Sequence, residues 1–262
     1  MLRRGSSRFI ASSARAIAQP AHHTHPHLVQ AGHVTRGVSA DEYAARRRSL
    51  AATLPSGTLA LFPAAAIPYM SHDVPFSPYH QSADLFYLCG LLEPESLLVC
   101  RTPTSQSPAE PRWSLFVMPD EPEKALWDGH RAGIDGAQCH FLPGGEVLPL
   151  SQAPRALATL LDEGGPVKSL LYDAHAHNSG LGELLSPVVA ACDKRRAGRL
   201  NPAHHVQKLR RQKSSAEVEL MSRAAHVSAC AHRATMCLSR EVASLPAPAP
   251  TEAVLGARFQ YE

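Results

Sequence analysis

Two clusters of histidines in the chain have the residue types and spacing that a metal site needs. Asp173, His175 and His177 alternate along a segment that follows a predicted strand. On an extended strand, residues two apart share one face, so three ligands would converge there. The second cluster holds four histidines within residues 22–27, and such tracts bind metals weakly. We favour the alternatives: an exposed loop at a strand end for the first cluster and a disordered tract for the second.

Motifs of several other enzyme classes are missing from the sequence. It contains no GxSxG, HExxH, Walker or GxGxxG pattern. The six cysteines include no CxxC pair, and several lie within apolar runs, so we expect reduced thiols and no zinc site. Serine-hydrolase, zincin and nucleotide-binding activities therefore have no support from motifs.

The net charge of +3 is distributed unevenly along the 262 residues. Residues 1–40 hold five arginines and no acid, whereas the remainder holds 21 basic and 23 acidic residues. The basic excess thus precedes the predicted fold, which argues against nucleic acid as a partner. The Arg-, Ser- and Ala-rich start is typical of a mitochondrial transit peptide, with a disordered basic tail as the alternative. No apolar run approaches 18 residues, so we expect no membrane span.

Capping patterns and apolar runs predict the elements that would position any site. Ser39 and Glu42 form a capping box before a helix at 41–54. Strands are expected at 58–62, 85–89, 96–100, 113–118 and 167–172, and helices at 122–127, 152–161 and 181–193. The last of these helices should be interrupted at Pro187. Strands separated by helices favour a mixed α/β domain.

The chain has a different pattern after about residue 206. Ser214 and Glu217 form a second capping box, and apolar residues at helical spacing predict a helix at 213–237. Thr251 is placed to cap a final helix from Glu252. We therefore divide the chain into a transit peptide and linker (1–38), an α/β domain (39–205) and the start of a further domain (206–262).

Five blocks in consistent order carry a resemblance to a known family. They are THPHLVQAGHVTRGVSADEYAARR (24–47), YMSHDVPF (69–76), FYLCGLLEPESLLV (86–99), LFVMPDEPEKALWDGHRAGIDGA (115–137) and LRRQKSSAEVELM (209–221). Through these blocks the chain is identified as a member of the Xaa-Pro aminopeptidases, the aminopeptidase P family, and resembles the mitochondrial type. The resemblance implies a creatinase-like α/β N-terminal domain, with a mixed sheet and flanking helices, followed by the opening helices of a truncated pita-bread domain.

The resemblance also implies a function. Members of the family remove N-terminal residues that precede proline, or trim imported precursors, with two manganese ions in the C-terminal domain. Two Asp, one His and two Glu hold those ions, and two metals of this kind activate a hydroxide. None of those positions matches a residue of this chain, so we expect no metal ligand, no catalytic residue and no activity from the chain alone. The alternative is a non-catalytic isoform that pairs with itself or with full-length subunits.

Four residues are candidates for lining the peptide cleft that the resemblance implies. Phe86 and Tyr87 lie on a predicted strand, where only one of the two would face the cleft. Arg131 lies in the loop after the helix at 122–127, and His80 lies in the proline-rich segment before the strand. The competing expectations are core packing for the aromatic pair, ion pairing within the domain for Arg131, and a surface or capping role for His80.

Overall fold

The computed structural model describes residues 17–72, 74–75, 78–104, 110–173, 181–242 and 251–262. The chain divides into two compact units, Met1–Gln212 and Lys213–Glu262. Within the described residues, the first unit holds a six-stranded sheet with helices on both faces, and the second holds two helices. The predicted α/β fold with a mixed sheet is confirmed.

The six-stranded sheet is mixed and has the order β6-β5-β4-β3-β7-β8. Its strands are β3 (Thr58–Pro63), β4 (Leu97–Arg101), β5 (Arg112–Val117), β6 (Glu146–Pro149), β7 (Ser169–Leu171) and β8 (Gly198–Leu200). The three strands β3, β4 and β5 pair antiparallel. The strands β6, β7 and β8 are parallel to their neighbours, as is usual where helices connect the strands.

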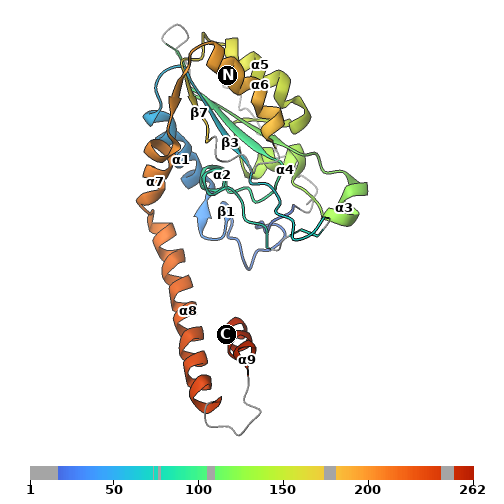
Figure 1. Ribbon diagram of the computed structural model, residues 1–262, viewed down its shortest axis with the longest axis vertical. Coiled ribbons are helices and arrows are strands. Elements are labelled where there is room, and N and C mark those ends of the chain that lie inside the picture. Colours follow the sequence, from blue (N-terminus) through green and yellow to red (C-terminus); the bar gives the residue numbers. More distant parts are fainter. Residues whose placement is uncertain (1–16, 73, 76–77, 105–109, 174–180, 243–250) are drawn as a thin grey trace, which may run out of the picture. The chain divides into compact units, whose positions relative to one another are not determined.

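One face of the sheet is covered by α5 (Ala153–Asp162) and α6 (Gly182–Lys194), as Figure 1 shows. Leu59 and Leu61 alternate along β3 and belong to the core cluster beneath these helices, together with Leu157 of α5. The interruption predicted at Pro187 is wrong, because α6 continues through that residue.

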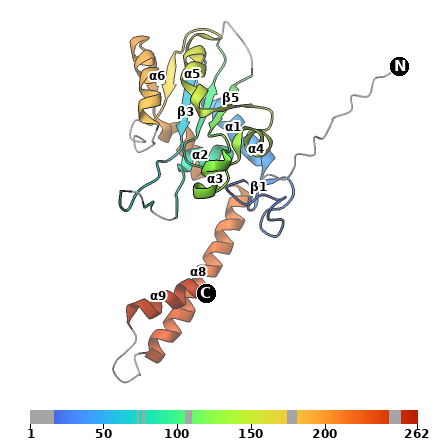
Figure 2. The ribbon, with the colours of Figure 1, turned by 90° about the vertical axis from the view of Figure 1, so that its right-hand side faces the viewer.

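The opposite face is covered by α1 (Ala40–Thr53) and α2 (Ala83–Cys89), which Figure 2 shows across the sheet from α5 and α6. The predicted capping box of α1 forms, since Ser39 Oγ accepts a hydrogen bond from the Glu42 N–H at 3.2 Å. The strand predicted at 85–89 is wrong, because this segment is α2. Gly90 ends the helix in the left-handed region at φ +76°, a conformation that favours glycine.

Several short elements lie between the larger ones. The predicted helix after β5 is confirmed as α3 (Pro122–Asp128). The elements that were not predicted are β1 (His33–Thr35), β2 (Val38–Ser39), α4 (Gly133–His140), β6, β8 and a π-helical turn (Ala203–Gln207) before α7 (Lys208–Arg211). The strands β1 and β2 pair antiparallel, so part of the expected linker is a hairpin. All six cysteines are free, with Cys89, Cys100 and Cys192 buried and Cys139, Cys230 and Cys237 exposed.

The second unit consists of α8 (Ser215–Val242) and α9 (Glu252–Tyr261). The capping box is reciprocal: Ser214 Oγ accepts from the Glu217 N–H at 3.2 Å, and Glu217 Oε2 accepts from the Ser214 N–H at 2.9 Å. The rings of His232 and Phe259 lie 4.8 Å apart, between the two helices. Among the described residues, no helix has the length and apolar character needed to cross a membrane.

Candidate functional site

Two arginines of α1 fix the position of α2. The Arg46 guanidinium donates to the Tyr87 carbonyl at 3.3 Å, and Arg47 donates to the Leu88 carbonyl at 2.9 Å. These carbonyls lie in the last turn of a helix, where intrahelical donors run out. Burial lowers the pKa of Arg47. The arginine of each contact is itself buried, so α1 and α2 form one structural block.

The aromatic pair Phe86 and Tyr87 is half-buried on α2 rather than on a strand. We expected only one of the two to face the cleft because neighbouring residues of a strand point to opposite sides. That argument does not apply to a helix. The Tyr87 ring lies 4.5 Å from the Arg46 guanidinium, a cation–π distance, and the same guanidinium lies 5.1 Å from the Tyr43 ring. Tyr87 is thus occupied by contacts within the domain.

Glu93 connects the segments that carry the other candidates, and sequence reasoning did not select it. The residue is 3% exposed. Its Oε1 accepts from the Ala132 N–H at 2.7 Å, and its backbone carbonyl accepts from Gln81 Nε2 at 2.7 Å. The N–H of Ala18 also donates to the Glu93 carboxyl. One buried residue therefore joins the proline-rich segment, the loop after α2 and the loop after α3.

Burial raises the pKa of Glu93, because desolvation penalises the charged carboxylate. The N–H of Ala132, the nearby Arg131 guanidinium and the N–H of Ala18 act in the opposite direction. A buried carboxyl is stable in a fold only when such donors surround it. The loops that supply these donors are consequently held against the loop of Glu93.

Arg131 lines a small pocket of about 230 Å³ beside α3, together with Glu95, Asp120 and Lys124. Its Nη2 donates to Glu95 Oε2 at 2.8 Å, and its backbone N–H donates to Asp120 Oδ1 at 3.1 Å. The expected ion pair within the domain is therefore present. The Nη1 atom is buried and has no hydrogen-bond acceptor among the residues that the structure describes. Arg131 is therefore held by Glu95 and Asp120 at the wall of this pocket.

His80 is exposed, and its neighbours fix its backbone. Tyr79 donates its hydroxyl to the Ala65 carbonyl at 2.8 Å, and Gln81 Oε1 accepts from the Ala65 N–H at 2.9 Å. Gln81 also reaches the carbonyl of Glu93. The segment of His80 and the segment of Arg131 are therefore connected through Glu93.

The short helix α3 exposes two large apolar side chains in adjacent positions. Trp127 is 86% exposed and Leu126 is 81% exposed. A tryptophan on the surface is a frequent anchor of a binding interface. The sequence contained a signal, because this tryptophan precedes the Gly129–Arg131 loop that the family blocks include, yet it was not selected as a candidate.

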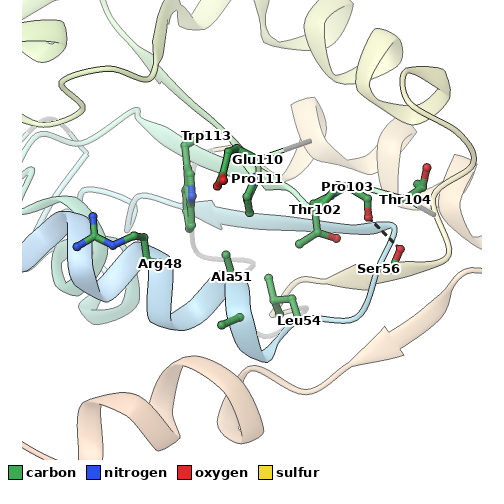
Figure 3. Close-up of a pocket in the computed structure, with 11 residues that line it drawn as sticks. Arg48, Ala51, Leu54, Ser56, Thr102, Pro103, Thr104, Glu110, Pro111 and Trp113 are labelled. Carbon is green, nitrogen blue, oxygen red and sulfur yellow. Dashed lines mark hydrogen bonds between the residues drawn. The ribbon is translucent and has the colours of Figure 1, made fainter. Parts of the chain in front are cut away.

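A groove of about 640 Å³ lies between α1, the residues that follow β4 and the start of β5 (Figure 3). Trp113 and Pro111 face Ala51 of α1 and its C-cap residue Leu54 across the groove. None of the four predicted cleft residues lines this groove. Residues 105–109, between β4 and β5 in the sequence, lie outside the described residues, so we assign no site here.

In the part of the chain that the structure describes, neither Asp173 nor the second histidine cluster belongs to a metal centre. His175 and His177 lie outside that part. In the other cluster, His22 Nδ1 lies 3.0 Å from the Val29 carbonyl and the His23 ring stacks on His140 at 5.1 Å. Across the described residues, no three His, Cys, Asp or Glu side chains form a group able to hold a metal ion.

Comparison with known proteins identifies the class to which this fold and these loops belong. A family model described as Aminopeptidase P, N-terminal domain, matches residues 43–167. The structure superposes on aminopeptidase PepP from Pseudomonas aeruginosa with a TM-score of 0.67 and 29% identity, covering 84% of this chain and 48% of that one. An Escherichia coli aminopeptidase P variant superposes with a TM-score of 0.71 and 22% identity, covering 86% of this chain and 49% of that one. At this identity the similarity concerns the fold alone. The chain belongs to the aminopeptidase P family.

Within that family the chain is similar to Xaa-Pro aminopeptidase 3. It is 35% identical to the Homo sapiens protein over 261 residues, which cover 95% of this chain and 48% of that protein. It is 29% identical over 251 residues to the protein from Arabidopsis thaliana called Intermediate cleaving peptidase 55, mitochondrial, covering 95% and 46%. The chain therefore spans about half the length of the curated relatives it matches, and it corresponds to their N-terminal half.

Proposed function

We propose that this chain is the N-terminal portion of a manganese-dependent Xaa-Pro aminopeptidase, which removes residues preceding proline or trims imported precursors. The observation that carries the proposal is the similarity to Xaa-Pro aminopeptidase 3 across 95% of the chain. The described residues do not fit a two-manganese centre, because no group of three potential ligands occurs among them. Because the chain spans 48% of the relative, we propose that the metal ligands lie in the other half of the enzyme, and we derive no catalytic step through the metals.

The contribution of this chain is to bind and orient the peptide. Arg131 supports this role, because it lines the pocket beside α3 and a guanidinium donates hydrogen bonds to carbonyl or carboxylate oxygens. Trp127 supports it as well, because an exposed indole offers an apolar surface for a peptide side chain. Phe86 and His80 remain candidates on the neighbouring segments.

A chimera tests this role directly. The first half of the Homo sapiens relative would be replaced by this chain, and kcat/KM would be measured on an Xaa-Pro peptide with Mn²⁺. We expect Trp127→Ala and Arg131→Ala each to lower kcat/KM about tenfold, which corresponds to about 1.4 kcal/mol. Glu123→Ala is the matched control, since Glu123 is an exposed residue of the same helix. Variants that behave like this control would contradict the peptide-binding role.

A second candidate function is an interaction module that pairs with itself or with full-length subunits. The observation in its favour is a set of exposed large apolar side chains that share one side of α8: Val218, Met221 and Met236. An amphipathic helix gains most of its stability from packing, so this surface favours a partner. Light scattering after size-exclusion chromatography tests the idea, and a monomer at high protein concentration would contradict it.

We propose mitochondrial localisation for the whole protein. The start of the chain is rich in Arg, Ser and Ala and has no acid within residues 1–40. A relative from Arabidopsis thaliana is named as mitochondrial. Import of the radiolabelled chain into isolated mitochondria, with protection from added protease, is the test. Import that ignores the membrane potential, or no import, would contradict the proposal.

A further inference from the structure

The segment that follows the basic start of the chain is bound into the folded domain by Gln19. This side chain is 6% exposed. Its Nε2 donates to the Gly90 carbonyl at 2.9 Å, and its Oε1 accepts from the Leu92 N–H at 2.8 Å. Both ends of the amide are therefore used, each on a backbone group more than 70 positions away.

The residues next to Gln19 make further contacts with the domain. The N–H of Ala18 donates to the buried Glu93 carboxyl. Ala21 is 4% exposed, and its carbonyl accepts from the His25 N–H at 2.7 Å. A methyl group on Gly136 of α4 would lie 3.4 Å from Ile17. The segment thus contacts both the loop after α2 and the helix α4.

These contacts differ from those of a targeting segment or a flexible linker. The hydrogen bond to the Gly90 carbonyl is buried and the one from the Leu92 N–H is part-buried, and removing Gln19 would leave both backbone groups without these partners. Termini that are removed or mobile are usually exposed and make few such bonds. A transit peptide that is cleaved away would take its contacts with it, so residues that satisfy the core must remain.

We propose that residues 18–21 form an N-terminal anchor of the folded domain, and that proteolytic removal of the preceding basic segment stops before Ala18. The first half of the proposal rests on the contacts alone. The second half rests on the mitochondrial targeting proposed above. The boundary between targeting segment and domain then lies about twenty residues before the boundary at 38 that the sequence suggested.

Limited proteolysis and truncation of the purified chain test the anchor. Digestion with a broad-specificity protease, followed by mass spectrometry of the stable product, should give an N-terminus at or before Ala18. Deleting residues 1–16 should leave Tm unchanged, whereas deleting residues 1–21 should lower Tm by on the order of 5 °C. A stable product that begins after Gln19, or equal Tm values for the two deletions, would overturn the anchor.

A pair of point variants tests the same contact without truncation. Gln19→Glu keeps the acceptor for the Leu92 N–H but places a carboxylate oxygen against the Gly90 carbonyl, so Tm should fall. Gln30→Glu makes the same change at an exposed position of the same segment, and should leave Tm unchanged. Equal effects of the two substitutions would contradict the anchor.

Processing of the imported chain tests the second half. After import into isolated mitochondria, the mature N-terminus read by mass spectrometry should lie at or before Ala18. A mature N-terminus beyond Gln19 would overturn the proposed boundary. Failure of import, with the expected proteolysis product, would overturn the targeting proposal and support the anchor by itself.

Discussion

Replacing Glu93 with alanine is expected to destabilise the first unit strongly, although Glu93 is an acid in a loop. Its carboxyl accepts hydrogen bonds from the N–H groups of Ala132 and Ala18. Each buried donor that loses its acceptor costs about 1–3 kcal/mol, so the free energy of unfolding should fall by about 3–4 kcal/mol. For a unit of this size that corresponds to a decrease in Tm on the order of 10 °C.

The control is Glu95→Ala, two residues away in the same loop. Glu95 pairs with Arg131 at 2.8 Å, but about half of its side chain is exposed, and such pairs contribute about 0–1 kcal/mol. Thermal and urea unfolding followed by circular dichroism would give both free energies. If the two alanine variants lost the same stability, within about 1 kcal/mol, Glu93 would not connect the loops as described.

The pH dependence of stability offers an independent check on Glu93. Because burial raises its pKa, the folded state keeps this proton at a pH where the unfolded chain has lost it. Stability from this group is therefore greatest below its ordinary pKa near 4.5, and decreases as the pH rises toward the raised value. Glu93→Gln should remove that component, so the stability difference between wild type and variant should change across this window. A difference that is constant with pH would contradict the pKa argument.

Three further predictions concern the packing of the same unit. Gly90→Ala should lower the free energy of unfolding by about 3 kcal/mol or more, because Gly90 has φ +76° and a methyl group there would lie 2.8 Å from the Tyr43 ring. Gly32→Ala is the control: Gly32 has φ +78° but open space around it, so this variant should lose only about 1–2 kcal/mol through backbone strain. Burial raises the pKa of Tyr43 to about 12, so stability should decrease between pH 10 and 12, and less steeply in Tyr43→Phe. A thiol reagent should label the three exposed cysteines of the native chain rapidly and the three buried ones only after unfolding, and rapid labelling of all six would contradict the packing.

The parts of the fold that sequence reasoning found are those with local signals. The capping boxes at Ser39 and Ser214 each predicted a helix start that the structure confirms. The error at α2 has a physical cause, since a short apolar run does not distinguish a buried strand from a helix. Gly90, which ends α2 in the left-handed region, was the available signal for a helix.

The candidate site was only partly predictable, because its organisation depends on distant contacts. Arg131 was selected from its loop, and the structure confirms the expected ion pair with an acid of the domain, which is Glu95. The connecting role of Glu93 could not be found, since its partner Ala132 lies 39 positions away and offers only a backbone N–H. The buried Gln19 was missed for the same reason, because its partners are backbone groups of a distant loop.

The division of labour between this chain and the rest of the enzyme is tested most directly by one turnover assay. Purified chain and the chimera would be incubated separately with Mn²⁺ and an Xaa-Pro peptide, with and without a chelator. We predict release of the N-terminal residue by the chimera, abolished by the chelator, and no release by the chain alone. Chelator-sensitive turnover by the chain alone, or a folded chimera without turnover, would contradict the account.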